Sequence, residues 1–493
     1  MKRKIRVALA VVVGLLVSLL FLDFTGTAHA WLGWLAKIQF LPALLALNAV
    51  ALVFLALLTL LFGRIYCSVI CPLGIFQDVI SWLSGKRKSA KRRFSYSPAK
   101  SKVRYVLLGL LVILFIAGLQ TIVSIFDPYA AYGRMASNFL SPLYLWGNNL
   151  LSDWAEKMDS YAVYSVDVWL KGGAPLLLAI VTFVVLSVLA WRSGRTYCNT
   201  ICPVGTILGF LSKYSLFRPV INTEKCNGCG LCARSCKASC IDSKAHEVDY
   251  SRCVVCFDCI DTCNRGAISY RRRVSQPAPA AESVDAGRRS MLTATAVVLA
   301  STALKAAEKK VDGGLAYIED KQIPERQTPI VPPGALSIRN LTRRCTACQL
   351  CITACPSQVL RPSTDMSRLM MPESSYERGY CRPECTRCSS VCPAGAIQPI
   401  SEEEKSSIQI GHAVFIKKNC VVLNKDVDCG NCARHCPAGA ITMVPSDPNN
   451  PSSRQIPAID EERCIGCGAC ENLCPSRPFS AIYVEGHEVH KTI

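Results

Sequence analysis

The cysteines of this 493-residue chain constrain its structure more than any other residue type does. Beyond residue 225 they recur in six groups of four, with a spacing equal or close to C-x2-C-x2-C-x3-C. In such a group three thiolates bind one cubic [4Fe–4S] cluster, and the fourth binds the cluster of a partner group. The six groups contain 24 of the 29 cysteines. The spacing therefore predicts six [4Fe–4S] clusters, arranged in three pairs.

Exchange of the fourth ligand within each pair assigns every cysteine of the six groups to one cluster. The predicted sets are Cys226, Cys229, Cys232 and Cys263; Cys253, Cys256, Cys259 and Cys236; Cys345, Cys348, Cys351 and Cys392; Cys381, Cys385, Cys388 and Cys355; Cys420, Cys429, Cys432 and Cys474; and Cys464, Cys467, Cys470 and Cys436. Two groups have a longer first gap, of three residues after Cys381 and eight after Cys420. A longer loop there leaves the ligands in place.

Other uses of cysteine fit this pattern poorly. Disulfides need an oxidising compartment throughout and do not call for triplets, and structural zinc sites use paired C-x2-C knuckles. Cys240 belongs to no set and stands where two other groups have alanine ("CKASCI" against "CPAGAI"). We expect it to be a neighbour of a cluster; the alternative is that it replaces Cys236 as a ligand.

Four apolar stretches near the N-terminus are long enough to cross a bilayer, which takes roughly 20 residues. They are 5–22, 40–62, 106–126 and 174–191. The first could instead be a signal peptide, because "TAHA" resembles a cleavage site. The stretches predict a membrane α-helical fold of four spans, formed by a two-helix repeat.

Basic residues give the orientation of these spans. They gather at 2–6 and at 86–93, whereas 127–173 has three bases and five acids. By the positive-inside rule, both ends of the four-helix unit lie in the cytoplasm and 127–173 lies outside. The formal net charge of +19 thus suits a membrane surface. We expect no nucleic-acid partner, since no motif for reading one is present.

A twelve-residue motif occurs twice, each time after an apolar stretch: "GRIYCSVICPLG" at 63–74 and "GRTYCNTICPVG" at 194–205. A parallel repeat implies a pseudo-two-fold axis along the membrane normal, and residues i and i+4 share one face of a helix. We therefore expect one shared iron–sulfur or metal site near the cytoplasmic boundary. Redox-active thiols and simple packing are the alternatives. The candidate ligands are Cys67, Cys71, Cys198 and Cys202.

A second export signal is predicted inside the chain. Residues 274–290 have the composition of a linker, and "GRRSMLTATAVVLASTALKAA" at 287–307 resembles a twin-arginine signal. The alternative is a fifth anchor helix, and both place the remainder outside the membrane. The predicted domains are a membrane domain (1–220), a cytoplasmic two-cluster domain (221–273), a linker with signal or anchor (274–310) and a periplasmic four-cluster domain (311–493).

Residues 1–273 resemble the membrane ferredoxins of the NapH/MauN type through the spans, the doubled GRxYCxxxCPxG and the two-cluster segment. Residues 287–493 resemble the periplasmic polyferredoxins of the NapG/MauM type through the leader and four cysteine groups. The two halves are fused here. The resemblance implies a protein of the bacterial inner membrane whose ferredoxin domains are of the bacterial dicluster type and have an α+β fold. It also implies a quinol dehydrogenase component, fed by the quinone pool (menaquinol or ubiquinol), with a periplasmic reductase or cytochrome c-type acceptor.

Two other functions stay open: an electron donor for maturing or reactivating a periplasmic metalloenzyme, and a conduit fed by cytoplasmic ferredoxin. The sequence has no haem CxxCH and no Gly-rich nucleotide loop, so we expect an electron carrier without its own substrate-reducing site. Electrons that cross the bilayer must use the doubled motif or quinone itself. Aromatic residues of the outer segments are expected to be interface anchors: Trp31, Trp34, Tyr129, Tyr132 and Trp146.

Overall fold

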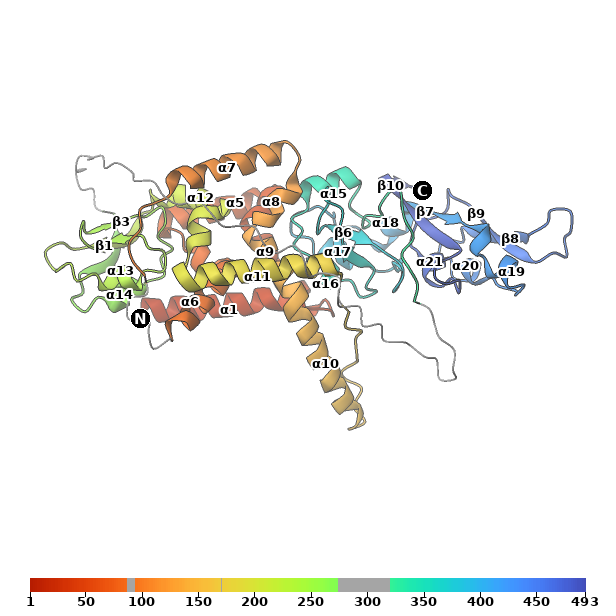
Figure 1. Cartoon of the computed structure of the whole chain (residues 1–493), viewed down its shortest axis with the longest axis horizontal. Helices are drawn as coiled ribbons and strands as arrows, with labels where there is room; N and C mark the ends of the chain where they lie inside the picture. The colour runs from red at the N-terminus through yellow and green to blue at the C-terminus, as the bar shows by residue number, and fades with distance from the viewer. Residues whose placement is uncertain (87–93, 170, 274–319) are drawn as a thin grey trace, which may run out of the picture.

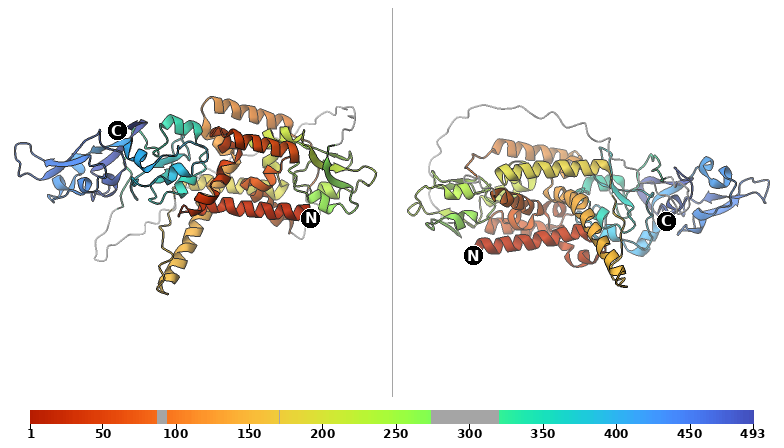
Figure 2. Two further views of the ribbon diagram at one scale, coloured as in Figure 1. Left: turned by 180° about the vertical axis from the view of Figure 1, so that it is seen from behind. Right: turned by 60° about the horizontal axis from the view of Figure 1, so that its bottom comes forward.

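The chain is elongated, with a helical unit between two cysteine-rich units (Figure 1). The computed structural model describes residues 1–86, 94–169, 171–273 and 320–493. Residues 217–273 lie beside the N-terminal end of helix α1, and residues 320–493 lie beyond its other end; the two further views in Figure 2 agree. The predicted linker with its twin-arginine-like segment or fifth anchor helix (274–310) lies outside the described residues.

The helical unit contains twelve α-helices and three short π-helices in its described residues. They are α1 (Lys2–Leu22), α2 (Thr27–Leu32), α3 (Trp34–Lys37), α4 (Phe40–Leu45), α5 (Ala49–Phe62), η1 (Tyr66–Ile70), α6 (Pro72–Gly85), α7 (Ser101–Ile116), α8 (Gln120–Phe126), α9 (Pro128–Met135), η2 (Ala136–Leu140), α10 (Ser141–Glu156), α11 (Gly173–Ser193), η3 (Tyr197–Ile201) and α12 (Pro203–Ser212). The π-helices η1 and η3 each contain five residues of one copy of the doubled motif, including its first cysteine.

Two described helices, α1 and α11, are long and apolar enough to cross a membrane, with 21 residues each. The expected spans 40–62 and 106–126 are not continuous helices, so four spans are not shown. The first divides into α4 and α5 around Leu47, whose φ is +53°, and the side chain of Asn48 caps α5. The second divides into α7 and α8 at Gly118, whose φ of +81° suits a residue without a Cβ.

Part of the segment expected outside folds back into the bundle. Asp127 accepts a hydrogen bond from the Ala130 N–H at 2.7 Å and so caps α9. Pro128 occupies the first turn of that helix, where no intrahelical N–H is needed. Helix α9 packs against α6 and α11, and α10 then points away from the bundle (Figure 1). A sequence count of charges places this segment on one side of a membrane but does not resolve this return.

The first cysteine-rich unit contains two small antiparallel sheets and two short helices. Its elements are β1 (Phe217–Ile221), α13 (Leu231–Ser235), β2 (Ile241–Asp242), β3 (Glu247–Val248), α14 (Asp258–Thr262) and β4 (Ile268–Arg272). Strand β1 pairs with β4, so that Phe217 lies opposite Arg272, and β2 pairs with β3. The sheets are too small to enclose an apolar core alone, and cysteines fill much of the interior.

The second cysteine-rich unit is built from short helices and three two-stranded sheets: β5 with β6, β7 with β10 and β8 with β9. Its elements are α15 (Ile338–Arg344), α16 (Leu350–Thr353), β5 (Leu360–Pro362), β6 (Pro372–Ser374), α17 (Arg387–Ser390), α18 (Glu402–Ser407), β7 (Ile408–Phe415), η4 (Lys417–Asn419), α19 (Val421–Asn424), α20 (Asn431–Arg434), β8 (Ile441–Pro445), β9 (Gln455–Ile459), α21 (Ala469–Asn472) and β10 (Ile482–Thr492).

The two pairs of cysteine groups in this unit are fixed to each other by buried contacts. The Cys381 N–H donates to the Cys467 carbonyl at 2.9 Å, and the Tyr376 hydroxyl donates to the Gly466 carbonyl at 2.7 Å. Tyr376 is fully buried, and its ring covers the backbone of Gly468, where a Cβ would overlap with it. The four groups therefore form one continuous body.

Candidate iron–sulfur centres and the doubled cysteine motif

Four cavities are each lined by the four cysteines of one predicted set. In each cavity three of the cysteines come from one group and the fourth comes from its partner group. The sets are Cys226, Cys229, Cys232 and Cys263; Cys253, Cys256, Cys259 and Cys236; Cys420, Cys429, Cys432 and Cys474; and Cys436, Cys464, Cys467 and Cys470.

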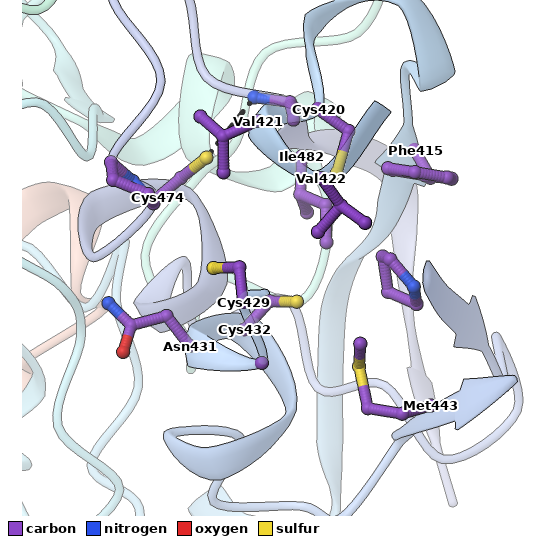
Figure 3. Close-up of a pocket in the computed structure, with 14 residues that line it drawn as sticks. Phe415, Cys420, Val421, Val422, Cys429, Asn431, Cys432, Met443, Cys474 and Ile482 are labelled. Carbon is purple, nitrogen blue, oxygen red and sulfur yellow. Dashed lines mark hydrogen bonds between the residues drawn. The ribbon is translucent and has the colours of Figure 1, made fainter. Parts of the chain in front are cut away.

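The cavity beside β7 shows the arrangement most clearly (Figure 3). Phe415, Val422 and Ile482 form apolar walls, and the Ala481 N–H donates to the Cys474 sulfur at 3.3 Å. An apolar wall excludes water, and N–H donors to sulfur stabilise its charge, so this surrounding suits a [4Fe–4S] cluster. The figure shows four sulfur atoms around one space, those of Cys420, Cys429, Cys432 and Cys474.

In the remaining two sets, which lie at 345–392, the shifts in cysteine pKa indicate the same exchange of the fourth cysteine. After burial, which raises the pKa most, the charge of Cys392 raises the pKa of Cys345 and Cys348. The charge of Cys355 likewise raises the pKa of Cys381 and Cys388. Cys392 thus lies with the group that begins at Cys345, and Cys355 lies with the group that begins at Cys381.

Backbone N–H groups point at cysteine sulfurs in several of these sets. The N–H groups of Ala347 and Ala440 donate to Cys345 and Cys436, each at 3.3 Å. The thiolates and donors fit [4Fe–4S] clusters, which need exactly this class of soft ligand. Among the residues that the structure describes, no three His, Cys, Asp or Glu side chains are close enough to hold one metal ion.

Cys240 lies at one of these cavities. Its sulfur is 3.5 Å from the Cys236 sulfur, and the residue lines the same cavity as the set that contains Cys236. The Cys240 thiol is the largest influence on Cys236 and lowers the pKa of that cysteine to about 7. A neighbour of a cluster is the position expected for Cys240; which of the two sulfurs is the ligand stays a prediction.

The two copies of the doubled motif fold alike, residue by residue. Gly63 and Gly194 end α5 and α11 with φ of +75° and +64°, which turns the chain into π-helices η1 and η3. Pro72 and Pro203 then start α6 and α12. The expectation that the cysteines share one face of an α-helix is wrong in its geometry, since the last cysteine of each copy is extended and caps the next helix. π-Helical turns of this kind are rare and concentrate at functional sites.

The two arginines of the motif exchange hydrogen bonds across the pseudo-two-fold axis. Arg64 donates to the Cys198 carbonyl at 3.1 Å, and Arg195 donates to the Cys67 carbonyl at 2.8 Å. Each also approaches the sulfur of its own copy, Arg64 to Cys67 at 3.7 Å and Arg195 to Cys198 at 3.8 Å. Both guanidinium groups are fully buried. Two cations against cysteine sulfur favour an anionic occupant or thiolates.

The last glycine of each copy makes this exchange sterically feasible. A Cβ on Gly74 would overlap with the Cys67 carbonyl oxygen and would lie 2.6 Å from the Arg195 guanidinium. A Cβ on Gly205 would overlap with the Cys198 carbonyl oxygen and would lie 2.8 Å from Arg64. These glycines are required by close approach, because neither has a positive φ.

The charges around the two arginines differ. Arg195 is paired with Asp78 at 2.8 Å, and Asp78 also pairs with Arg6 and, at 3.2 Å, with Lys237. Burial raises the pKa of Asp78, but the three cations outweigh it and hold that pKa well below its usual range. Arg64 has no carboxylate within 4 Å among the described residues; it donates to the Asn199 side chain at 2.9 Å.

The four cysteines of the doubled motif belong to one buried cluster. That cluster also contains Val254 and Cys256 of the first cysteine-rich unit and Ala131 and Met135 of α9. The Arg195 N–H donates to the Lys237 carbonyl at 2.8 Å, next to Cys236 in the chain. The doubled motif therefore packs directly against the set that contains Cys236 and Cys256, and also against α9. The four cysteines are Cys67, Cys71, Cys198 and Cys202.

The opposite side of α9 packs against the second cysteine-rich unit. Tyr129 and Ala130 share a buried cluster with Cys345, Cys348 and Cys351. Gly133 lies so close to the Cys348 carbonyl that a Cβ there would overlap with it. One two-turn helix thus lies between the doubled motif and the nearest predicted cluster of the second cysteine-rich unit.

Sequence patterns did not identify several of these residues. Tyr129 was expected as an interface anchor, but it is fully buried, and burial raises its pKa well above the usual value. Arg64 and Arg195 belong to the doubled motif, and this duplication was the one feature of the sequence that could have indicated their role. Asp78 and Gln349 had no such signal. Gln349 accepts hydrogen bonds from Ser137 at 2.5 Å and from Asn138 at 3.2 Å across the interface with η2.

Comparison with known families finds iron–sulfur domains in three parts of the chain. A 4Fe-4S binding domain matches residues 44–91 and 174–223, a second family of the same description matches 219–242, and a 4Fe-4S dicluster domain matches 427–477. The first match contains both copies of the doubled motif, and its cysteines are those of the motif alone.

Comparison with individual proteins finds relatives of both halves of the expected fusion. The chain is 27% identical to the ferredoxin-type protein NapH of Escherichia coli (strain K12) over 246 residues, 48% of this chain and 72% of NapH. It is 31% identical to the methylamine utilization ferredoxin-type protein MauM of Methylophilus methylotrophus over 167 residues, 33% of this chain and 72% of MauM. It is 25% identical to the putative electron transport protein YccM of E. coli over 226 residues, 45% of this chain and 55% of YccM. No solved structure matches.

Proposed function

Because the chain belongs to the family of ferredoxin-type iron–sulfur proteins that includes MauM, we propose that it is a membrane-bound quinol dehydrogenase component. It is an iron–sulfur electron-transport protein with multiple 4Fe–4S clusters, related to NapH as well. The finer proposal is that menaquinol or ubiquinol donates electrons, which pass to a periplasmic reductase or cytochrome c-type acceptor.

The observation that carries this proposal is the continuous packing from one cysteine-rich unit to the other. Cys256 of the first cysteine-rich unit, called the inner unit from here on, packs with the doubled motif, and the motif packs with Ala131 and Met135. The same helix packs through Tyr129 against Cys348 of the second cysteine-rich unit, called the outer unit. When bound, [4Fe–4S] clusters accept and release single electrons. The chain's own part is to hold the thiolates, exclude water around them and supply N–H and guanidinium donors that set their potentials.

One observation favours a second function, in which a cytoplasmic donor feeds the chain. Cys229 of the set at 226–263 is exposed. Lys225 and Arg265 line the same cavity, and Arg234 donates to the Cys229 carbonyl at 2.8 Å. Basic residues around an accessible cluster would attract an acidic electron carrier such as a ferredoxin. In this second function the inner unit is the entry point for electrons.

One anaerobic experiment separates the two functions. The full chain with its clusters is purified in detergent and mixed either with a reduced menaquinol analogue or with a reduced low-potential ferredoxin, and cluster reduction is followed by EPR. Rapid reduction by the quinol supports the quinol dehydrogenase. If quinol leaves the clusters oxidised while ferredoxin reduces them, the quinol proposal is wrong and the conduit replaces it.

A further inference from the structure

A cavity of about 180 Å3 lies where the helical unit meets the outer cysteine-rich unit. Resting on the function proposed above, we propose that this cavity binds the quinol headgroup and places it beside the clusters at 345–392. Its walls include Phe24, Ser141, Leu145, Trp169, Lys171 and Cys355.

The position of the cavity suits a lipid-soluble donor. Phe24 follows the last residue of α1 by two positions, and Lys171 precedes the first residue of α11 by two. These are the two described helices that can cross a membrane, so the cavity lies at the level where both would leave the bilayer. Leu143 and Trp146 of the adjacent α10 are 66% and 62% exposed. They offer an apolar path for an isoprenoid tail towards the headgroup.

The size and lining suit a quinol ring. An apolar cavity of about 150 Å3 holds a benzene ring, and 180 Å3 leaves space for two ring oxygens. The aromatic side chains of Phe24 and Trp169 provide faces for the ring. Polar side chains such as Ser141, Thr353 and Arg387 also line the cavity, and they can fix the orientation of the ring by hydrogen bonds to its oxygens.

The cavity is directly connected to the predicted electron acceptors. Cys355 lines it and is a predicted ligand of the cluster at 381–388, while Ile352 and Thr353 line it next to Cys351. Cys351 is a predicted ligand of the other cluster of that pair. A headgroup in this cavity would lie in contact with Cys355, a predicted ligand of one cluster, and with the two residues that follow Cys351, a predicted ligand of the other.

Lys171 provides the proton chemistry that quinol oxidation needs. Its ammonium makes one hydrogen bond within the described part of the chain, to the Ser137 carbonyl at 3.4 Å, and has no carboxylate partner there. The amine of Lys171 lines the cavity, and an amine at this position would be the first acceptor for a proton from a quinol hydroxyl. The quinol loses two electrons and two protons as it becomes quinone. The two cysteine sets would hold clusters able to take up one electron each, and both protons would reach bulk water, the first by way of Lys171.

The test uses the full cluster-loaded chain and two variants of the cavity. Leu145→Trp fills the cavity from α10, and Lys171→Met removes the amine at similar length. The matched controls are Leu150→Trp, at a position 51% exposed on the same helix, and Lys157→Met at its end. The measurements are the rate of cluster reduction by a menaquinol analogue, reduction by dithionite, and labelling of the oxidised protein by an azidoquinone, mapped by mass spectrometry.

We expect Lys171→Met to slow reduction by quinol about 100-fold, the order that a positioned base contributes. Leu145→Trp should abolish both quinol reduction and labelling of residues 137–171 and 352–358, with dithionite reduction and both controls unchanged. If the unaltered protein is reduced by quinol and both cavity variants react and label equally well, the cavity is not the site, although the proposed function stands. If the unaltered protein is not reduced by quinol, the proposed function fails first and this inference fails with it.

Discussion

The two copies of the doubled motif have the same backbone and the same exchanged arginine bonds, but they lie in different charge environments. Counting 131 residues along from Asp78, which pairs with Arg195, gives Gly209 in the second copy. The space of a side chain at Gly209 is filled instead by the guanidinium of Arg104. One arginine therefore faces a carboxylate with two further cations, and the other lies near a second cation.

The first cysteines of the two copies, Cys67 and Cys198, also have different polar neighbours. Gln77 approaches the Cys198 sulfur at 3.4 Å, whereas the corresponding residue of the second copy is Leu208, which has no donor for Cys67. Symmetry in the backbone thus brings the four motif cysteines into one buried cluster, and asymmetry in a few side chains gives the two copies different charge surroundings. Such a difference in charge between the two copies suits electron transfer in one direction, because the motif contacts the cysteine set of Cys236 and Cys256 on one side and α9 on the other.

Removal of one motif cysteine should have the largest effect. We expect Cys198→Ser to stop electron transfer between the inner and outer units, because the motif is the packed connection between them. Rapid-freeze EPR after quinol addition should then show only outer clusters reduced, with the inner signal identified by its loss in Cys226→Ser. Thr200→Ala, on the same π-helix and bonded to the Thr196 carbonyl, is the control. Normal reduction of the inner pair in Cys198→Ser would leave the motif with a packing role only.

The carboxylate on one side of the motif should dominate its stability. Asp78→Asn leaves Arg6, Arg195 and Lys237 without their common partner, so we expect destabilisation of about 3–5 kcal/mol, the range for breaking a buried ion pair. Thermal unfolding in detergent measures it. Asp261→Asn, which removes an exposed pair with Arg3, should change stability by less than about 1 kcal/mol. Equal effects in the two variants would contradict the central role of Asp78.

The close-approach glycines should be equally sensitive in both copies, because the backbone is symmetric. Gly74→Ala and Gly205→Ala each force a Cβ against a cysteine carbonyl, and we expect each to cost about 1–3 kcal/mol. Gly109→Ala, in α7 with open space around it, should instead stabilise the helix by up to about 1 kcal/mol. A shift of apparent Tm in only one copy would show that the two backbones are not equivalent in solution.

The smallest predicted effect concerns the side-chain donor that one cysteine has and the other lacks. Gln77→Leu makes the first copy match Leu208 and removes a hydrogen bond worth about 1 kcal/mol, or about 40 mV for a one-electron centre. We expect the midpoint potential of a centre at the motif to fall, since the donor stabilises the more negative reduced state. A redox titration followed by EPR measures the shift. A rise in potential would contradict the assigned direction.

The cysteine sets and the repeat could be predicted from the sequence. The ligands of one cysteine group are close along the chain, and the cluster itself determines their spacing. The four cavities lined by crossed sets have the geometry that this spacing predicts. Hydropathy gave α1 and α11, but it missed the breaks at Leu47 and Gly118. Those breaks depend on single residues with positive φ inside apolar runs, which an average over a window conceals.

The sequence by itself determined which residues are candidate ligands, that the motif is doubled, and that apolar helices accompany cysteine-rich units. The tertiary structure alone decided that Arg64 and Arg195 exchange partners, that Asp78 serves one copy only, and that α9 returns into the bundle between the motif and Cys348. The physical reason is range. Ligand spacing and hydropathy are local properties, whereas these contacts join residues more than a hundred positions apart, and only packing brings them together.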